Sequence, residues 1–109
     1  MTVRRGDVVL AVIARAYGKV RPALVLQDQR EVLSSVVCCM ISSDRQPGPF
    51  RIPVSQRDDN GLDADSAIAV DKLCAVPLRE IRRTIGRISG DEQDRVAHAL
   101  ADLFGLSSR

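Results

Sequence analysis

Short apolar segments occupy most of the first four fifths of the chain, and turn-forming residues separate them. The segments cover residues 7–14, 21–27, 34–42, 51–54, 66–71 and 84–89. They are rich in Val, Ile, Leu and Ala, and their length and β-branched content indicate strands. Both alternating sets of positions are apolar in the longer segments. We therefore expect both faces of the sheet to be covered, one by the curled sheet and the other by a helix or a partner subunit.

Turn residues predict the connections between these strands. Gly18 follows Tyr17 between the first two segments and indicates a hairpin. A Pro-Gly pair in residues 44–49 and the sequence DDNG at residues 58–61 predict loops. Pro53 places the fourth strand at an edge or a bulge of the sheet. Residues 77–83 are expected to form a short helical turn.

One helix is predicted near the end of the chain. Ser89 and Glu92 have the spacing of a capping box, and Gly105 provides a stop signal. Between them, apolar residues repeat at helical spacing: Val96, Ala99, Leu100 and Leu103. The predicted fold class is mainly β with a C-terminal helix, forming a small β-barrel. A length of 109 residues suits a single domain.

Charge is unevenly distributed along the chain, although the formal net charge is only +2. Residues 1–57 contain nine Lys or Arg and four Asp or Glu, whereas residues 58–109 contain seven and ten. The basic half could face phosphates, or it could simply be a solvated surface. Only 3% of the residues are aromatic, which argues against modules that stack bases on aromatic platforms.

The cysteines and apolar runs indicate the compartment. Cys38, Cys39 and Cys74 lack the spacing of a metal site, and we find no secretory signal. The longest apolar run is too short to span a membrane. We expect a soluble, cytoplasmic protein with reduced thiols, no membrane association, and no metal or cofactor.

Candidate chemistry centres on residues at strand ends, because common enzyme motifs are absent. Arg21 precedes Pro22, which favours an extended backbone, and its guanidinium suits phosphate oxygens. Ser42 and Ser43 end the third strand, and Asp71 and Lys72 end the fifth. Each could belong to an anion site, or could be ordinary turn chemistry or an ion pair. His98 lies off the apolar stripe of the helix and is expected to be solvated.

Several motifs occur in one order along the chain: RRGDVV, VRPALVLQ, ISS, NGLDADSAIAVDKL and IGRIS. In this order the chain resembles the MazF/PemK (Kid) family of type II toxin–antitoxin systems. The resemblance covers nearly all of residues 1–109, as a single toxin domain. It implies an SH3-like β-barrel of the CcdB/PemK type, a homodimer, and a cognate antitoxin with an acidic C-terminal segment. It also implies a sequence-specific endoribonuclease, an mRNA interferase, that cuts single-stranded RNA without metal. The RNA 2′-hydroxyl would attack the adjacent phosphate, leaving a 2′,3′-cyclic phosphate and a 5′-hydroxyl.

The resemblance also assigns residues. Arg21 would stabilise the pentacoordinate phosphate, and could serve as general acid. Ser42 would hydrogen-bond a phosphate oxygen, a role that falls to Ser43 if the alignment shifts by one. Asp71 would be a base or an orienting group. The RNA-binding surface is expected to contain further residues: Arg15, Tyr17, Lys19, Ser43, Arg45, Arg51 and Lys72.

Three departures from the family pattern affect these assignments. The first loop, RAYGK, is short and contains no histidine, and Ala69 stands where some members carry an arginine. The alternative function is a non-catalytic, CcdB-like barrel that binds a protein target such as gyrase, or that binds RNA without cleaving it.

Overall fold

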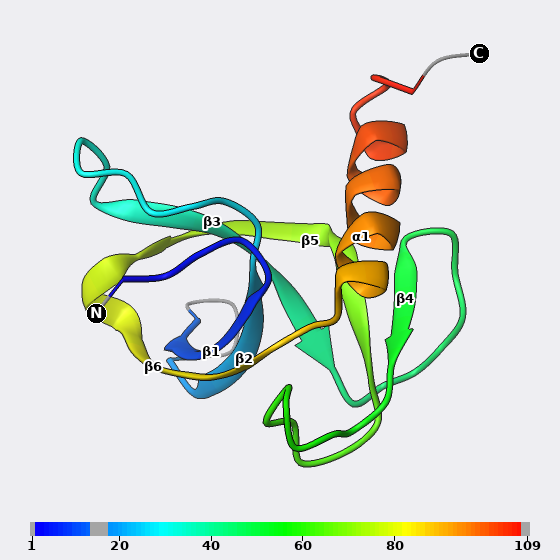
Figure 1. Cartoon of the computed structure of the whole chain (residues 1–109), viewed down its shortest axis with the longest axis horizontal. Coiled ribbons are helices and arrows are strands. Elements are labelled where there is room, and N and C mark those ends of the chain that lie inside the picture. The colour runs from blue at the N-terminus through cyan, green and yellow to red at the C-terminus, as the bar shows by residue number, and fades with distance from the viewer. Residues whose placement is uncertain (1, 14–17, 108–109) are drawn as a thin grey trace.

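A computed structural model describes residues 2–13 and 18–107 of the chain (Figure 1). Its elements follow in the order β1 (Asp7–Val12), β2 (Val20–Val25), β3 (Ser35–Ser42), β4 (Arg51–Val54), β5 (Ser66–Pro77), a 3₁₀ turn (Leu78–Glu80), β6 (Ile81–Arg87) and α1 (Gly90–Leu103). The predicted class, mainly β with a C-terminal helix, is confirmed.

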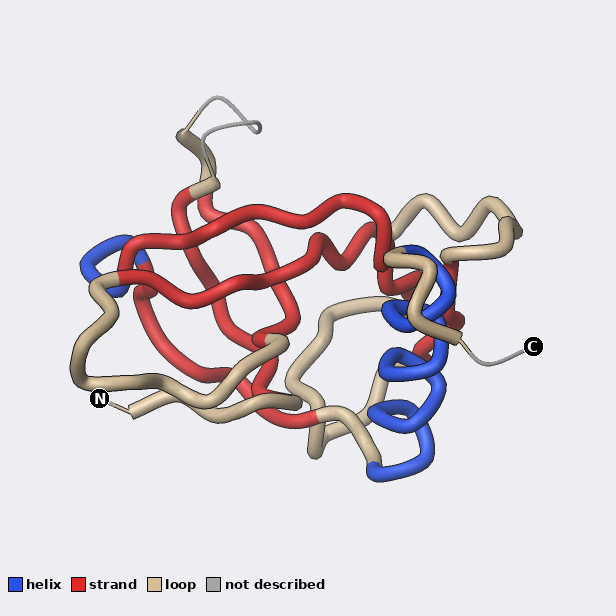
Figure 2. Tube along the Cα trace, turned by 90° about the horizontal axis from the view of Figure 1, so that it is seen from above, coloured by secondary structure: helices blue, strands red, loops and turns tan. Residues whose placement is uncertain are grey.

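The strands form one antiparallel sheet in the order β4-β5-β3-β2-β1-β6. Figure 2 shows how strongly this sheet curls. It does not close by hydrogen bonds within the described residues, because β4 and β6 remain its two edges. The edge position of β4 agrees with the prediction from Pro53, since proline cannot donate to a ladder.

Apolar side chains pack on both faces of the sheet, as the sequence predicted. Leu24 belongs to a core cluster that also contains Val96 of α1, so the helix covers this face. Ala23 and Val25 belong to a second cluster with Val9 and Cys38. Because successive residues of a strand point to opposite faces, the two clusters lie on opposite sides of β2. Within this one chain, the curled sheet and α1 therefore cover both faces.

The helix begins and ends as predicted. The Ser89 hydroxyl accepts a hydrogen bond from the Glu92 backbone N–H, and the Glu92 carboxylate accepts one from the Ser89 N–H. Gly105 adopts a φ of 71° just beyond the helix, the left-handed conformation that suits glycine at a C-terminus.

Strand β5 corrects one prediction. The strand does not end at Asp71 and Lys72 but continues to Pro77. Met40 of β3 pairs with Ala69, while the preceding Cys39 pairs with Leu73. Three residues, 70–72, are therefore inserted on β5 as a bulge. The predicted helical turn at residues 77–83 is also shorter than expected, because Ile81 already begins β6.

Candidate functional site

A cleft of about 840 Å³ lies against the sheet. All six strands contribute to its lining, together with residues 61–64 of the loop between β4 and β5. Five residues singled out from the sequence line this cleft: Arg21, Ser42, Ser43, Arg51 and Lys72. Three of them carry a positive charge, against Asp44 and Asp63 in the same lining, so the cleft has a formal balance of +1 and offers cationic donors to an anion.

Strand register brings Arg21 and Ser42 together. Ala23 of β2 pairs with Met40 of β3; Arg21 lies two residues before Ala23 and Ser42 two residues after Met40, at the ends of these neighbouring strands, and both line the cleft. Arg21 is exposed, and its side chain makes no hydrogen bond or ion pair with residues 2–13 or 18–107. Its guanidinium donors are therefore available to a ligand in this part of the structure.

The bulge in β5 lies between the pairs Met40–Ala69 and Cys39–Leu73 and carries Asp71 and Lys72. Both residues are exposed, and Lys72 lines the cleft. Asp71 lies outside the lining, and its Oδ1 accepts a hydrogen bond from Nη1 of Arg51, which does line the cleft. Bulges often redirect side chains beside functional sites. Here the bulge places a lysine in the cleft and an aspartate against an arginine of the neighbouring strand.

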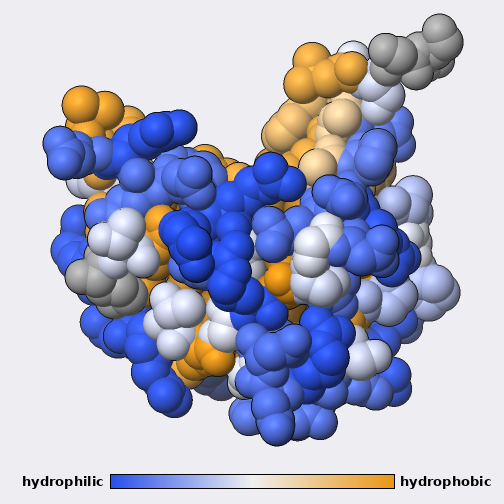
Figure 3. Space-filling view, in the orientation of Figure 1, coloured by the Kyte–Doolittle hydropathy of each residue, from blue (hydrophilic) through white to orange (hydrophobic). Residues whose placement is uncertain are grey.

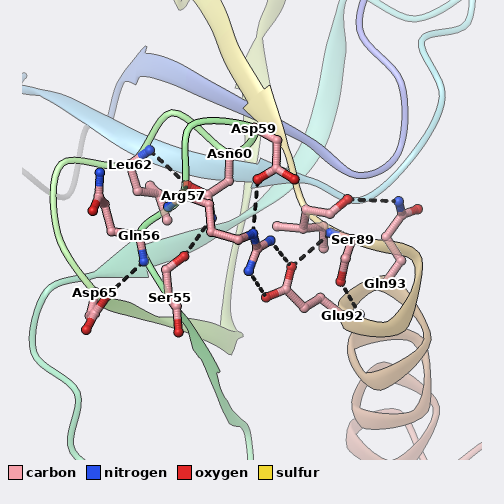
Figure 4. A network of polar contacts seen from close by, with 11 residues as sticks. Ser55, Gln56, Arg57, Asp59, Asn60, Leu62, Asp65, Ser89, Glu92 and Gln93 are labelled. Carbon is pink, nitrogen blue, oxygen red and sulfur yellow. Dashed lines mark hydrogen bonds and ion pairs between the residues drawn. The ribbon is translucent and has the colours of Figure 1, made fainter.

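The loop between β4 and β5 forms one wall of the cleft, and Asn60 holds it in shape (Figure 4). Asn60 is fully buried. Its Nδ2 donates to the Ser55 carbonyl at 2.8 Å, and its Oδ1 accepts from the N–H groups of Arg57 and Leu62 at 3.2 and 3.1 Å. Three hydrogen bonds from one side chain fix the loop just before Gly61 and Leu62 enter the cleft lining.

An ion pair fastens this loop to the start of α1. Nη2 of Arg57 lies 2.7 Å from Oε1 of Glu92, and Nη1 lies 3.2 Å from Oε2 (Figure 4). Burial alone would raise the pKa of Glu92, but hydrogen bonds from Arg57 and Ser89 outweigh it and hold that pKa below its usual value. Residues 58–61 were predicted only as a turn. The Arg57–Glu92 contact that joins this loop to α1 spans 35 positions, so no local sequence signal indicated it.

Two other predicted residues, Arg45 and Lys19, are not among the described residues that line the cleft. Arg45 is 3.8 Å from Asp65, in an exposed ion pair. Lys19 is exposed on the connection between β1 and β2. Arg15 and Tyr17 lie outside the described residues. His98 is exposed, as predicted. The described part of the chain contains no group of three or more His, Cys, Asp or Glu side chains placed to hold a metal ion.

Comparison with known proteins gives the family. Residues 4–104 match the family described as the PemK-like, MazF-like toxin of type II toxin–antitoxin systems. The chain belongs to this family. One PemK/MazF-like relative, named a probable endoribonuclease MazF, comes from Mycolicibacterium smegmatis. It is 32% identical over 107 residues, covering 95% of this chain and 98% of the relative.

Solved structures agree with this assignment. The toxin MazF-mt6 of Mycobacterium tuberculosis superposes with a TM-score of 0.77 at 25% identity, covering 94% of this chain and 99% of that one. A MazE-MazF structure from Deinococcus radiodurans shares the fold, with a TM-score of 0.82 at 22% identity over 98% and 99% of the two chains. In this PemK/MazF-like chain, Ala69 pairs directly with Arg51 of β4. Among the described residues, no helix is long and apolar enough to cross a membrane.

Proposed function

We propose that the chain is an endoribonuclease toxin that cleaves single-stranded RNA in the cytoplasm and is restrained by a cognate antitoxin. Three cationic side chains carry this proposal, because Arg21, Arg51 and Lys72 line one cavity together with Ser42. A phosphodiester needs this combination of positive charge and hydrogen-bond donors. Membership of a toxin family with a curated endoribonuclease relative supports the same activity.

The cleft residues suit a reaction in which the RNA supplies the nucleophile. The 2′-oxygen forms a bond to the adjacent phosphorus, the bond from phosphorus to the 5′-oxygen breaks, and a 2′,3′-cyclic phosphate and a 5′-hydroxyl result. Arg21 stabilises the charge that grows on the phosphoryl oxygens, and the Ser42 hydroxyl donates to one of them. A base accepts the 2′-hydroxyl proton and an acid protonates the 5′-oxygen. Asp71 is a candidate base or orienting group, and Arg21 a candidate acid. No step requires a metal ion.

The partners of the toxin follow from its family and its surface. An antitoxin with an acidic C-terminal segment would complement the charge of the cleft that binds RNA. We propose a homodimer because large apolar side chains are exposed: Val20, Val32, Leu33, Val37, Phe104 and Leu106. Figure 3 shows apolar surface at the C-terminal end of α1. A second copy would remove such surface from water.

Cleavage of a single-stranded RNA in excess EDTA tests the activity and the site together. The wild-type chain should cut the RNA and leave 2′,3′-cyclic phosphate ends, which mass spectrometry of the products identifies. Arg21→Ala should reduce the rate by about a hundredfold or more, because it removes charge stabilisation from the transition state. Arg79→Ala is the matched control, since Arg79 lies in the 3₁₀ turn and does not line the cleft.

Two results would contradict the proposal. Equal rates for the wild type and Arg21→Ala would contradict the assignment of Arg21 to the site. Loss of wild-type cleavage in EDTA would contradict the metal-independent mechanism. RNA left intact, together with inhibition of gyrase supercoiling by the same protein, would favour a barrel that acts by binding a protein target.

A further inference from the structure

We infer that Arg51 is a second phosphate-binding arginine of the cleft, and that Asp71 is a positioning residue that acts through Arg51. This inference rests on the proposed function and deepens it, because it decides between the two roles left open for Asp71. The two side chains form an ion pair, yet they are not equivalent. Arg51 lines the cleft, whereas Asp71 is not among the lining residues.

Strand register places Arg51 on the same face of the sheet as the proposed reaction centre. Arg51 pairs with Ala69 of β5, and Ala69 pairs with Met40 of β3. Paired residues share a face, and Ser42 shares that face with Met40 because it lies two residues further along β3. Ala69 is buried, and because its side chain is a single methyl group it leaves space in the cleft between Arg51 and Met40.

The two arginines approach the cleft from opposite sides. Strands β5 and β3 lie between β4 and β2, so three strand spacings separate the backbones of Arg51 and Arg21. At about 4.8 Å for each spacing, this is about 14 Å measured across the strands of the curled sheet, and Arg21 also lies two residues along β2 from Ala23, the residue level with Arg51. A phosphate held between Arg21 and Ser42 lies at the β2 side of this space. We therefore assign to Arg51 the next phosphate along the RNA, on the β4 side.

The ion pair prepares Arg51 for this task. A guanidinium has five N–H donors, and the contact with Asp71 uses Nη1, so donors remain for a phosphate. Arg51 is about three-quarters buried, with 27% of its side chain exposed. A guanidinium whose position is already fixed by an ion pair loses less conformational entropy when a ligand binds. Asp71 therefore contributes by orienting Arg51, and proton transfer from the 2′-hydroxyl belongs to another group.

Salt-dependent binding tests the role of Arg51. The probe is a single-stranded RNA with 2′-O-methyl groups, which cannot supply the nucleophile, and its Kd is measured over a series of salt concentrations. Arg51→Gln should weaken binding by about 10- to 100-fold at low salt, and should reduce the slope of log Kd against log salt by about 0.7. Arg51→Lys should keep the slope, because it keeps the charge.

The matched control is Arg79→Gln, which removes an arginine whose partner is Glu80 at 4.0 Å, away from the cleft. It should leave the affinity and the slope unchanged. Circular dichroism on each variant establishes that it is folded. A folded Arg51→Gln variant with the wild-type slope would overturn the inference. This measurement does not need cleavage, so it distinguishes failure of the inference from failure of the proposed nuclease activity.

A double variant tests whether Asp71 acts through Arg51. Asp71→Asn should lower kcat/KM for RNA cleavage in the wild-type background by about tenfold, and should have no further effect when residue 51 is already glutamine. A general base would behave differently. Its loss would cost about a hundredfold or more in both backgrounds and would remove the acidic limb of the pH–rate profile. That result would overturn the positioning role.

Discussion

Replacing Glu92 with glutamine should destabilise the chain at neutral pH, and the loss should shrink in acid. Three hydrogen bonds reach the Glu92 carboxylate, two from Arg57 and one from the Ser89 N–H. Glutamine keeps one acceptor oxygen, which can serve Ser89 and one Arg57 nitrogen. Its NH₂ group would face the other nitrogen of Arg57, so one charge-assisted bond becomes a contact between two donors.

The structure sets the magnitude. A hydrogen bond to a charged group contributes about 1.5–3 kcal/mol. The Glu92 side chain is only 10% exposed, but that of Arg57 is 35% exposed, and solvent screens it. We therefore expect a loss of about 1–2 kcal/mol. The pKa of Glu92 is lowered in the folded chain, so the stability due to its charge is present above the unfolded-state pKa and is lost as pH falls through the folded-state value.

Urea unfolding at pH about 7 and at pH about 3 measures this effect. The chain contains no Trp, so far-UV circular dichroism follows the transition. With a slope of about 1.5 kcal/mol per M, the midpoint should fall by about 1 M at neutral pH and by much less in acid. Asp91→Asn is the control, since Asp91 is an exposed acid in the same helical turn, and it should cost only about 0.5 kcal/mol. An equal loss for Glu92→Gln at both pH values would refute the ionic explanation.

Three further predictions concern positions where the packing is unusually restrictive. Gly61→Ala should lower Tm by about 10 °C or more in thermal unfolding, because φ is +68° and the new Cβ would lie 2.2 Å from the Ile85 carbonyl oxygen. Gly90→Ala is the control and should not lower Tm, because nothing lies within 4 Å of the new Cβ. Asn60→Ala should lower the free energy of unfolding in urea by about 2–4 kcal/mol, because the three hydrogen bonds of the Asn60 side chain are buried. A decrease below about 1 kcal/mol would show that water replaces these bonds. Cys38 should resist iodoacetamide in the native chain and react in denaturant, because burial, and to a smaller extent the nearby Cys74 thiol, raises its pKa to about 12. Intact-mass spectrometry measures the labelling, and rapid labelling of the native chain would contradict this prediction.

The strands and the helix were predictable because their signals are local. The apolar segments, Pro53 and the capping residues of α1 each determine the backbone structure of residues within a few positions in the sequence. The bulge was not predictable in the same way. A charged Asp71-Lys72 pair inside an apolar segment indicates a strand end, and only the pairing of β5 with β3 shows that the strand resumes at Leu73.

The candidate site was predictable only in part for a similar reason. Arg21 was singled out from its place before Pro22, and the structure places it in a cleft with Ser42 and Lys72, where its role remains a prediction. The ion pair between Arg51 and Asp71 joins residues 20 positions apart, and the one between Arg57 and Glu92 joins residues 35 positions apart. Contacts of this length depend on how the sheet folds, and no spacing in the sequence specifies them.

In a regular strand the same residues must both pair with the neighbouring strand and present charge to a ligand, and the bulge in β5 assigns these two roles to different residues. The residues before and after it pair with β3 in two antiparallel ladder segments, while Asp71 and Lys72 lie between these segments, outside the pairing, and are exposed. Substitutions at these two positions can therefore alter the charge presented to a ligand at little cost in strand pairing. In an evolving lineage, such a segment allows substrate preference to diverge while the scaffold is preserved. In the laboratory, it is the place to randomise when a new cleavage preference is sought.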